Sequence, residues 1–348
     1  SRQMQPTSRS IFAAFFTASL AAALFPAACS DETTGATTAP TSTSTGTGGA
    51  GGSGGAGGAE GPYVRHDINP KDTDAAIDQA FDPHFAAYDP KVASNGKLYI
   101  HLPGFSGTPT ESLQILELAI AAGYHVIGLM YVNGNNVADL CGADLNCYEN
   151  VRLELIDGMD RTDKINVSVG NSIENRIAKL LAHLNATYPS EGWGAFLDAG
   201  NANAPLYASI ALSGYSQGGG HAALMAKTRA LARVVLFSAV IDGDNGIPAS
   251  WLKTNPATAN SLHFGLAHTQ DPAFDNITSG WATLGMSFFG IPVDVDANEP
   301  PYANSHQLTT SLNTVTWNSH AGTAVDAHAP TVDGASALVP AWTYLIGK

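Results

Sequence analysis

The feature that most constrains the fold of this chain is the segment Gly214-Tyr215-Ser216-Gln217-Gly218, which two further glycines follow. The apolar run at residues 206–212 before it has the composition of a buried strand, and residues 221–231 after it have the pattern of a helix. Strand, Gly-x-Ser-x-Gly and helix in this order are typical of a nucleophile elbow, a sharp turn that exposes a serine hydroxyl above the end of a strand. The segment therefore predicts that Ser216 is the centre of a reactive site.

The five-residue pattern is weak when it stands alone, because it also occurs at residues 51–55 inside a glycine-rich tract. No strand-like run precedes that copy, and no helix-like run follows it. A tight turn at the end of a core strand is the structural alternative for Ser216. The flanking segments favour the elbow at residues 214–218.

Residues 1–29 have the pattern of a targeting segment. Two arginines, Arg2 and Arg9, precede an apolar run at residues 11–25 that is too short for a membrane span. The small residues before Cys29 resemble the lipobox of bacterial lipoproteins, although Pro26 stands where a leucine-like residue is usual. We expect lipidation at Cys29, with signal cleavage near Ala28 as the alternative.

Residues 30–61 consist mostly of Thr, Ser, Gly, Ala and Pro and predict a disordered linker, since they contain too little apolar surface to offset the entropy of ordering. From residue 62 to residue 348 the composition is that of one globular domain. Signal, cysteine and flexible tether together predict a protein outside the cytoplasm, either anchored to a bacterial membrane surface through a lipid on Cys29 or secreted.

The cysteines and the charge narrow the class of protein further. Cys141 and Cys147 lie six positions apart in a loop-like segment and predict a small disulfide outside the cytoplasm, which leaves Cys29 as the odd cysteine. No nearby histidine completes a zinc pattern, so we expect neither a metal nor another cofactor. A formal net charge of −14 argues against nucleic acid as a partner, because phosphates require clustered Lys and Arg.

The globular region alternates apolar strands with helical patterns, which predicts an α/β fold with a mainly parallel sheet covered on both faces. Thr108, Pro109 and Glu111 have the spacing of a helix start with a capping box. The expected strands lie at residues 97–102, 124–131, 206–212, 232–238, 262–267 and 313–317, and the expected helices at 108–122, 148–156, 172–188, 221–231 and 335–346.

This order of elements resembles the α/β-hydrolase superfamily over residues 95–348, and the elbow Gly-Tyr-Ser-Gln-Gly is similar to that of cutinases. The resemblance implies a serine nucleophile, then an acid, then a histidine in chain order, and activity on esters or related acyl compounds. It does not fix a substrate, because one fold supports many functions.

The acid that orients the histidine should follow a strand after the elbow. Asp271 lies in the turn after the expected strand at residues 262–267 and matches the family position. Asp242 and Asp244, which follow the preceding strand, are the alternatives. A turn aspartate that caps backbone amides is the structural interpretation of each.

The base should lie in a loop after the last strand. His320 follows Trp317 closely, where members of the superfamily place their histidine, and is therefore preferred. His328 is the alternative in the same region, and His268 is a third candidate because it shares a turn with Asp271.

The oxyanion hole requires two preorganised donors. The backbone N–H of Gln217 is one by the geometry of the elbow, and the backbone N–H of Phe105 in the glycine-rich loop 103–107 is the second. The resemblance to cutinases implies that Ser106 adds its hydroxyl as a further donor. For the substrate pocket we expect Tyr215, and Trp281 from the irregular stretch at residues 273–308, which forms either a pocket wall or a satellite core.

The sequence therefore predicts a serine hydrolase that cleaves small-molecule or polymeric carboxylic esters through an acyl-enzyme. A peptidase or acyltransferase on the same triad is the alternative within enzymes. A surface binding protein that has this fold and no catalysis is the alternative from a different class.

Overall fold

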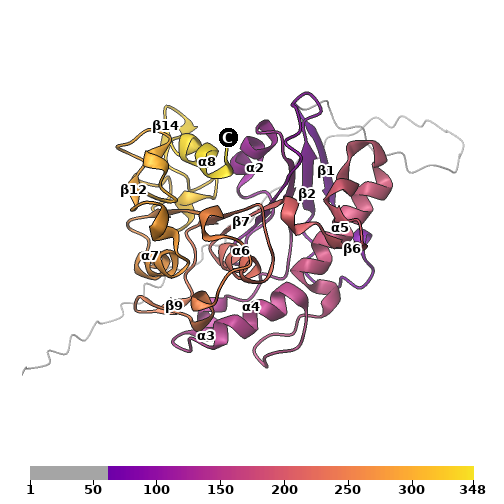
Figure 1. Cartoon of the computed structure of the whole chain (residues 1–348), viewed down its shortest axis with the longest axis horizontal. Coiled ribbons are helices and arrows are strands. Elements are labelled where there is room, and N and C mark those ends of the chain that lie inside the picture. Colours follow the sequence, from indigo (N-terminus) through magenta and orange to yellow (C-terminus); the bar gives the residue numbers. More distant parts are fainter. Residues whose placement is uncertain (1–61) are drawn as a thin grey trace, which may run out of the picture. The chain divides into compact units, whose positions relative to one another are not determined.

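The computed structural model describes residues 62–348, apart from the side chains of Ala202 and Asn203 (Figure 1). The targeting segment at residues 1–29, the lipidation site at Cys29 and the linker at residues 30–61 lie outside the described residues. Within the described part, no helix is both long enough and apolar enough to cross a membrane.

A nine-stranded sheet with the order β1-β2-β4-β3-β7-β8-β11-β13-β12 forms the centre of the fold. The pairs β1–β2 and β2–β4 are antiparallel, and every other pair in this sheet is parallel. The strands are β1 (Val64–Ile68), β2 (His84–Tyr88), β3 (Leu98–Leu102), β4 (His125–Gly128), β7 (Ile210–Tyr215), β8 (Arg233–Phe237), β11 (His263–His268), β12 (Val293–Asp294) and β13 (Gln307–Thr310).

Helices cover both faces of this sheet because its strands are apolar on both sides (Figure 1). In β3, Ile100 and Leu102 belong to one buried cluster, whereas Tyr99 belongs to a second cluster on the opposite face, as the alternation of side chains along a strand requires. Helices α2 (Leu113–Ala121) and α8 (Val339–Ile346) contribute to the second cluster. The first cluster contains side chains from α4 (Cys147–Asp157), α5 (Ile173–Thr187), α6 (Gln217–Thr228) and α7 (Phe274–Thr283).

The predicted mainly parallel, doubly covered α/β sheet is confirmed. The helices α4 and α5 lie close to their predicted ranges. In α5 the apolar face that contains Ile177, Leu181 and Leu184 is buried, and the Ser172 hydroxyl accepts a hydrogen bond from the Asn175 N–H at the helix start.

Several predicted elements differ from the structure. Strand β7 begins at Ile210 rather than at residue 206, and helix α8 begins at Val339 rather than at residue 335. Helix α2 begins at Leu113 rather than at Thr108, because residues 109–112 form turns before the helix starts; in this segment the Glu111 carboxylate accepts the Gly104 N–H (3.2 Å). Residues 313–317 form no strand: their composition is β-like, but the chain turns there, with Trp317 at a φ of 60° and 82% exposed. The last strand of the sheet in chain order is β13. All four of its residues are buried, although its sequence, Gln-Leu-Thr-Thr, is mainly polar.

The predicted disulfide between Cys141 and Cys147 is confirmed. Cys141 is the last residue of the short helix α3 (Val137–Cys141), and Cys147 is the first residue of α4. The bond therefore ties α3 to the start of a helix that packs on the sheet.

Candidate active site

The chain turns sharply at Ser216, between the end of β7 and the start of α6. Ser216 has a φ of 52° and a ψ of −115°, a conformation that costs a residue with a side chain about 1–3 kcal/mol. Glycines on either side make the turn feasible. A Cβ on Gly214 would press against the backbone of Gly218, and a Cβ on Gly218 would collide with the carbonyl oxygen of Leu102.

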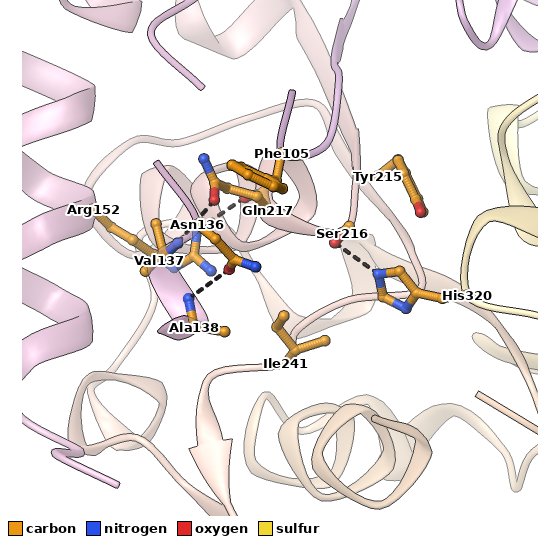
Figure 2. Close-up of a pocket in the computed structure, with 10 residues that line it drawn as sticks. All are labelled: Phe105, Asn136, Val137, Ala138, Arg152, Tyr215, Ser216, Gln217, Ile241 and His320. Atoms are coloured by element: carbon orange, nitrogen blue, oxygen red, sulfur yellow. Dashed lines mark hydrogen bonds between the residues drawn. The ribbon is translucent and has the colours of Figure 1, made fainter. Parts of the chain in front are cut away.

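Three side chains from three different loops meet at this turn. His320 Nε2 lies 2.7 Å from the Ser216 hydroxyl, and His320 Nδ1 lies 2.7 Å from a carboxylate oxygen of Asp271 (Figure 2 shows the serine–histidine contact). An ionised carboxylate only accepts hydrogen bonds, so Nδ1 carries the proton and the Nε2 lone pair faces the serine hydroxyl. This tautomer leaves Nε2 ready to take a proton from Ser216.

The Asp271 carboxylate is almost fully buried and is held in place. Its other oxygen accepts the Ala273 N–H at 2.8 Å. His268 supports the same turn: its Nδ1 accepts the Gln270 N–H, and its Nε2 donates to the Leu312 carbonyl oxygen. His268 is thus a structural residue of the Asp271 turn and does not contact Ser216 in the structure.

His328, Asp242 and Asp244 all lie away from the Ser216 hydroxyl and have partners of their own. His328 hydrogen-bonds the Thr316 hydroxyl. The Asp242 carboxylate binds the Arg152 guanidinium through two contacts of 2.5 and 2.6 Å and also accepts the Trp251 indole N–H. Asp244 lies in a small hairpin made by β9 (Gly243–Asp244) and β10 (Ile247–Pro248), where it accepts a hydrogen bond from Asn245.

The loop that follows β3 lies against the elbow. Phe105 and Gln217 both line the cavity beside Ser216 (Figure 2). Within residues 62–348 neither the Phe105 N–H nor the Gln217 N–H donates to another protein group. Both backbone donors are therefore available to a bound molecule.

Asn133 holds this loop in place. Its side-chain amide, which is 3% exposed, donates to the carbonyl oxygens of Gly104 and Gly107, each at 2.8 Å, and its own carbonyl oxygen accepts the Ser106 N–H. Glu111 supports the other side by accepting the Gly104 N–H, and burial raises the pKa of its carboxyl. The loop is thus fixed at several backbone groups around Phe105.

The cavity at Ser216 is open and has a volume of about 200 Å³. Tyr215 lines it as predicted, with its ring centroid 5.4 Å from that of His320. Ser106 is exposed, has a φ of 55°, and is not among the lining residues, so its predicted contact with substrate has no support in this geometry.

The predicted pocket role of Trp281 is wrong. Its side chain is fully buried in the core, where the indole N–H donates to the Ala239 carbonyl oxygen at 2.7 Å. The ring packs over Gly265 of β11, a position at which a Cβ would collide with the indole. Of the stretch at residues 273–308, Met286 and Tyr302 are also buried in the core, whereas Phe288 is 85% exposed, and none of its residues is among those that line the cavity at Ser216.

A buried ion pair underlies the cavity. Arg152 and Asp242 are 1% and 0% exposed, and the remaining guanidinium nitrogen, Nη1, donates to the Gln217 carbonyl oxygen at 2.9 Å. The guanidinium lies so close to Gly220 that a Cβ there would overlap it. The pair therefore connects α4, the first turn of α6 and the segment after β8 behind the nucleophilic turn.

Several residues at this site escaped the sequence-based prediction, namely Asn133, Asn136, Arg152 and Ile241. Asn133 follows the predicted strand at residues 124–131, and polar side chains after buried strands are a usual sign of a site in α/β sheets. Nothing in the sequence indicates that Arg152, in the middle of a helix, reaches the start of α6.

No group of three or more His, Cys, Asp or Glu side chains that could hold a metal ion occurs in the part of the chain that the structure covers. No model of a known protein family matches the sequence, and no curated protein matches it either. Among solved structures, the chain is similar to a putative dienelactone hydrolase from Klebsiella pneumoniae subsp. pneumoniae MGH 78578, with a TM-score of 0.37 and 11% identity over 72% of this chain and 85% of that one.

Proposed function

We propose that this protein is a serine hydrolase that cleaves carboxylic esters through an acyl-enzyme. The observation that carries the proposal is the continuous hydrogen-bonded chain from Ser216 through His320 to the buried carboxylate of Asp271. A serine hydroxyl becomes a useful nucleophile only when a base removes its proton. In this hydrogen-bonded series the base is His320, in the tautomer that leaves Nε2 free to take the proton.

In the proposed reaction, the Ser216 oxygen attacks the ester carbonyl carbon while His320 Nε2 takes the hydroxyl proton. Asp271 stabilises the imidazolium and stays ionised. The tetrahedral intermediate collapses when His320 gives its proton to the leaving alkoxide, which departs as the alcohol. A water molecule then repeats the sequence on the acyl-enzyme and releases the acid.

The proposed oxyanion hole consists of the backbone N–H groups of Gln217 and Phe105. Two observations support it: both residues line the cavity at Ser216, and neither N–H is used by another group of the described chain. Donors that are fixed before the reaction stabilise developing charge without reorganisation.

We propose short-chain esters as substrates, because the cavity of about 200 Å³ is smaller than the pockets of roughly 300–1,000 Å³ that enclose drug-sized ligands. Peptide cleavage and acyl transfer use the same groups and stay as alternatives. We also propose that the protein acts outside the cytoplasm, anchored through Cys29 or secreted; the targeting segment and the Cys141–Cys147 disulfide support this.

A fluorophosphonate probe tests the proposed function directly, because it reacts covalently with an activated serine. We expect the wild-type protein to be labelled, with the adduct on the peptide that contains Ser216, and Ser216→Ala to remain unlabelled. Ser94→Ala, which changes an exposed serine, serves as the matched control and should be labelled like the wild type. An unlabelled wild type, or an adduct that persists in Ser216→Ala, would contradict the proposal.

Removing the Asn133 side chain should impair catalysis through the oxyanion loop. Asn133→Ala removes two hydrogen bonds of about 1 kcal/mol each from the carbonyl groups on either side of Phe105. Loss of an oxyanion donor costs roughly 10²–10³-fold in kcat, so a loosened donor should cost about 10–100-fold. Steady-state kinetics on p-nitrophenyl acetate measure the effect. The exposed neighbour gives the control Asn135→Ala, which should retain the wild-type kcat, and an equal kcat for Asn133→Ala would overturn this role.

A further inference from the structure

The side chain of Asn136 presents an unused hydrogen-bond donor to the cavity at Ser216. Its Oδ1 accepts the Ala138 N–H at 3.0 Å and so caps the start of α3. A backbone N–H requires an acceptor, so this contact fixes which side of the amide is oxygen. Figure 2 shows that Nδ2 consequently points into the cavity, and no protein group within residues 62–348 accepts a hydrogen bond from it.

The position of His320 indicates which part of a substrate would meet Asn136. The histidine has to give its proton to the leaving alcohol, so the leaving group must lie on the histidine side of the serine. Figure 2 shows His320 on one side of Ser216, and Asn136 and Val137 on the other. The carbonyl oxygen would face the Gln217 and Phe105 N–H groups, so the α3 side of the cavity is left for the acyl chain of the substrate.

The surroundings of Asn136 are mainly apolar, so its amide donor distinguishes acyl chains that contain an oxygen atom from those that do not. Val137, Ala138 and Ile241 present apolar surface to the same cavity. The guanidinium of Arg152, which also lines the cavity, is already committed to Asp242 and the Gln217 carbonyl oxygen. A plain alkyl chain would displace water from the Asn136 amide without replacing its hydrogen bond, which costs affinity.

We propose that Asn136 is a specificity-determining residue, which donates a hydrogen bond from Nδ2 to an oxygen atom in the acyl chain of the substrate. The preferred substrates are then esters of short oxygen-bearing acids, such as alkoxy, hydroxy or oxo acids, rather than esters of plain alkanoic acids. This inference rests on the proposed ester hydrolysis and adds the substrate class to it.

Two matched esters test the inference, p-nitrophenyl methoxyacetate and p-nitrophenyl butyrate. Their acyl chains have the same number of non-hydrogen atoms and differ by one ether oxygen in place of a methylene group. The ratio of their kcat/KM values is divided by the ratio of their rates with hydroxide, which removes the difference in intrinsic reactivity. For the wild type we expect this corrected ratio to be about 10, the effect of one well-placed hydrogen bond.

The variants Asn136→Asp and Asn136→Ser both keep a side-chain oxygen that can cap α3, and both remove the amide donor. The corrected ratio should fall to 1 or below in Asn136→Asp, whose carboxylate only accepts hydrogen bonds and repels the ether oxygen. It should fall by less in Asn136→Ser, whose hydroxyl is still a donor but sits on a shorter side chain. Asn135→Asp places the same charge on the exposed neighbour and should keep the wild-type ratio. A ratio is used because general damage to the site affects both esters alike.

The outcomes separate this inference from the proposed function. A wild type that hydrolyses both esters with a corrected ratio near 1 overturns the role of Asn136 and leaves ester hydrolysis standing. A corrected ratio that stays near 10 in both Asn136 variants also overturns the role of Asn136 and leaves ester hydrolysis standing. A wild type that hydrolyses neither ester and reacts with no fluorophosphonate overturns both.

Discussion

Replacing His320 by alanine is expected to lower kcat for ester hydrolysis by roughly 10⁴–10⁶-fold, because the Ser216 hydroxyl then has no base within hydrogen-bond distance. His320 is also the proton donor to the leaving alcohol, so both halves of the reaction lose their acid–base group. Single-turnover and steady-state kinetics on p-nitrophenyl acetate measure the change. Circular dichroism checks that the variant is folded, because the substitution leaves a buried carboxylate oxygen of Asp271 without its partner.

The matched control is His328→Ala, which changes a histidine eight positions further along the same region. His328 hydrogen-bonds the Thr316 hydroxyl and does not contact Ser216, so this variant should retain most of the wild-type kcat. The assignment of the base to His320 would be refuted by the reverse pattern, in which His328→Ala is inactive and His320→Ala hydrolyses the ester normally.

A second pair of variants should separate the roles of two buried aspartates that follow neighbouring strands after the elbow. Asp271→Asn keeps the shape of the side chain but no longer favours the tautomer in which Nε2 faces the serine. We expect kcat to fall by roughly 10⁴-fold while the free energy of unfolding changes little.

Asp242→Asn should have the opposite effect, with a large loss of stability and a smaller loss of kcat. It leaves the guanidinium of Arg152 buried without a counter-charge, which typically costs about 3–5 kcal/mol of the free energy of unfolding. Urea denaturation followed by circular dichroism measures this loss in both variants. Loss of activity without loss of stability in Asp242→Asn, together with an active Asp271→Asn, would exchange the roles of the two residues.

The fold could be predicted where the pattern of side chains is local and unambiguous. The amphipathic face of α5 and the apolar runs of β3, β8 and β11 are strong signals, and the structure contains these elements close to the expected residues. The elbow was recognisable because a strained serine needs glycines at fixed positions beside it. Strand β13 was missed because its burial comes from its neighbours β11 and β12 in the sheet, whereas its own residues are mainly polar.

The prediction of the site depended on chain order as well as on local pattern. Ser216, Asp271 and His320 are the residues that the structure brings together, although each acid and base had rivals close by in the sequence. Trp281 shows the limit of this reasoning, because nothing in the sequence reveals that its indole packs over Gly265. Asn133 and Asn136 depend on contacts between loops that only the folded chain specifies.

The three hydrogen-bonded residues and Phe105 come from loops that follow β3, β7, β11 and β13. These strands lie close together in the sheet, with only β8 between β7 and β11, but the residues are distributed over more than 200 residues of chain. No short contiguous fragment of the domain contains the complete set of groups. Contacts of this kind form late, because the chain entropy of closing long loops must be overcome first. Regain of activity after denaturation would therefore indicate that the whole sheet has formed. Activity of the proposed catalytic centre can thus be used to follow folding of this domain.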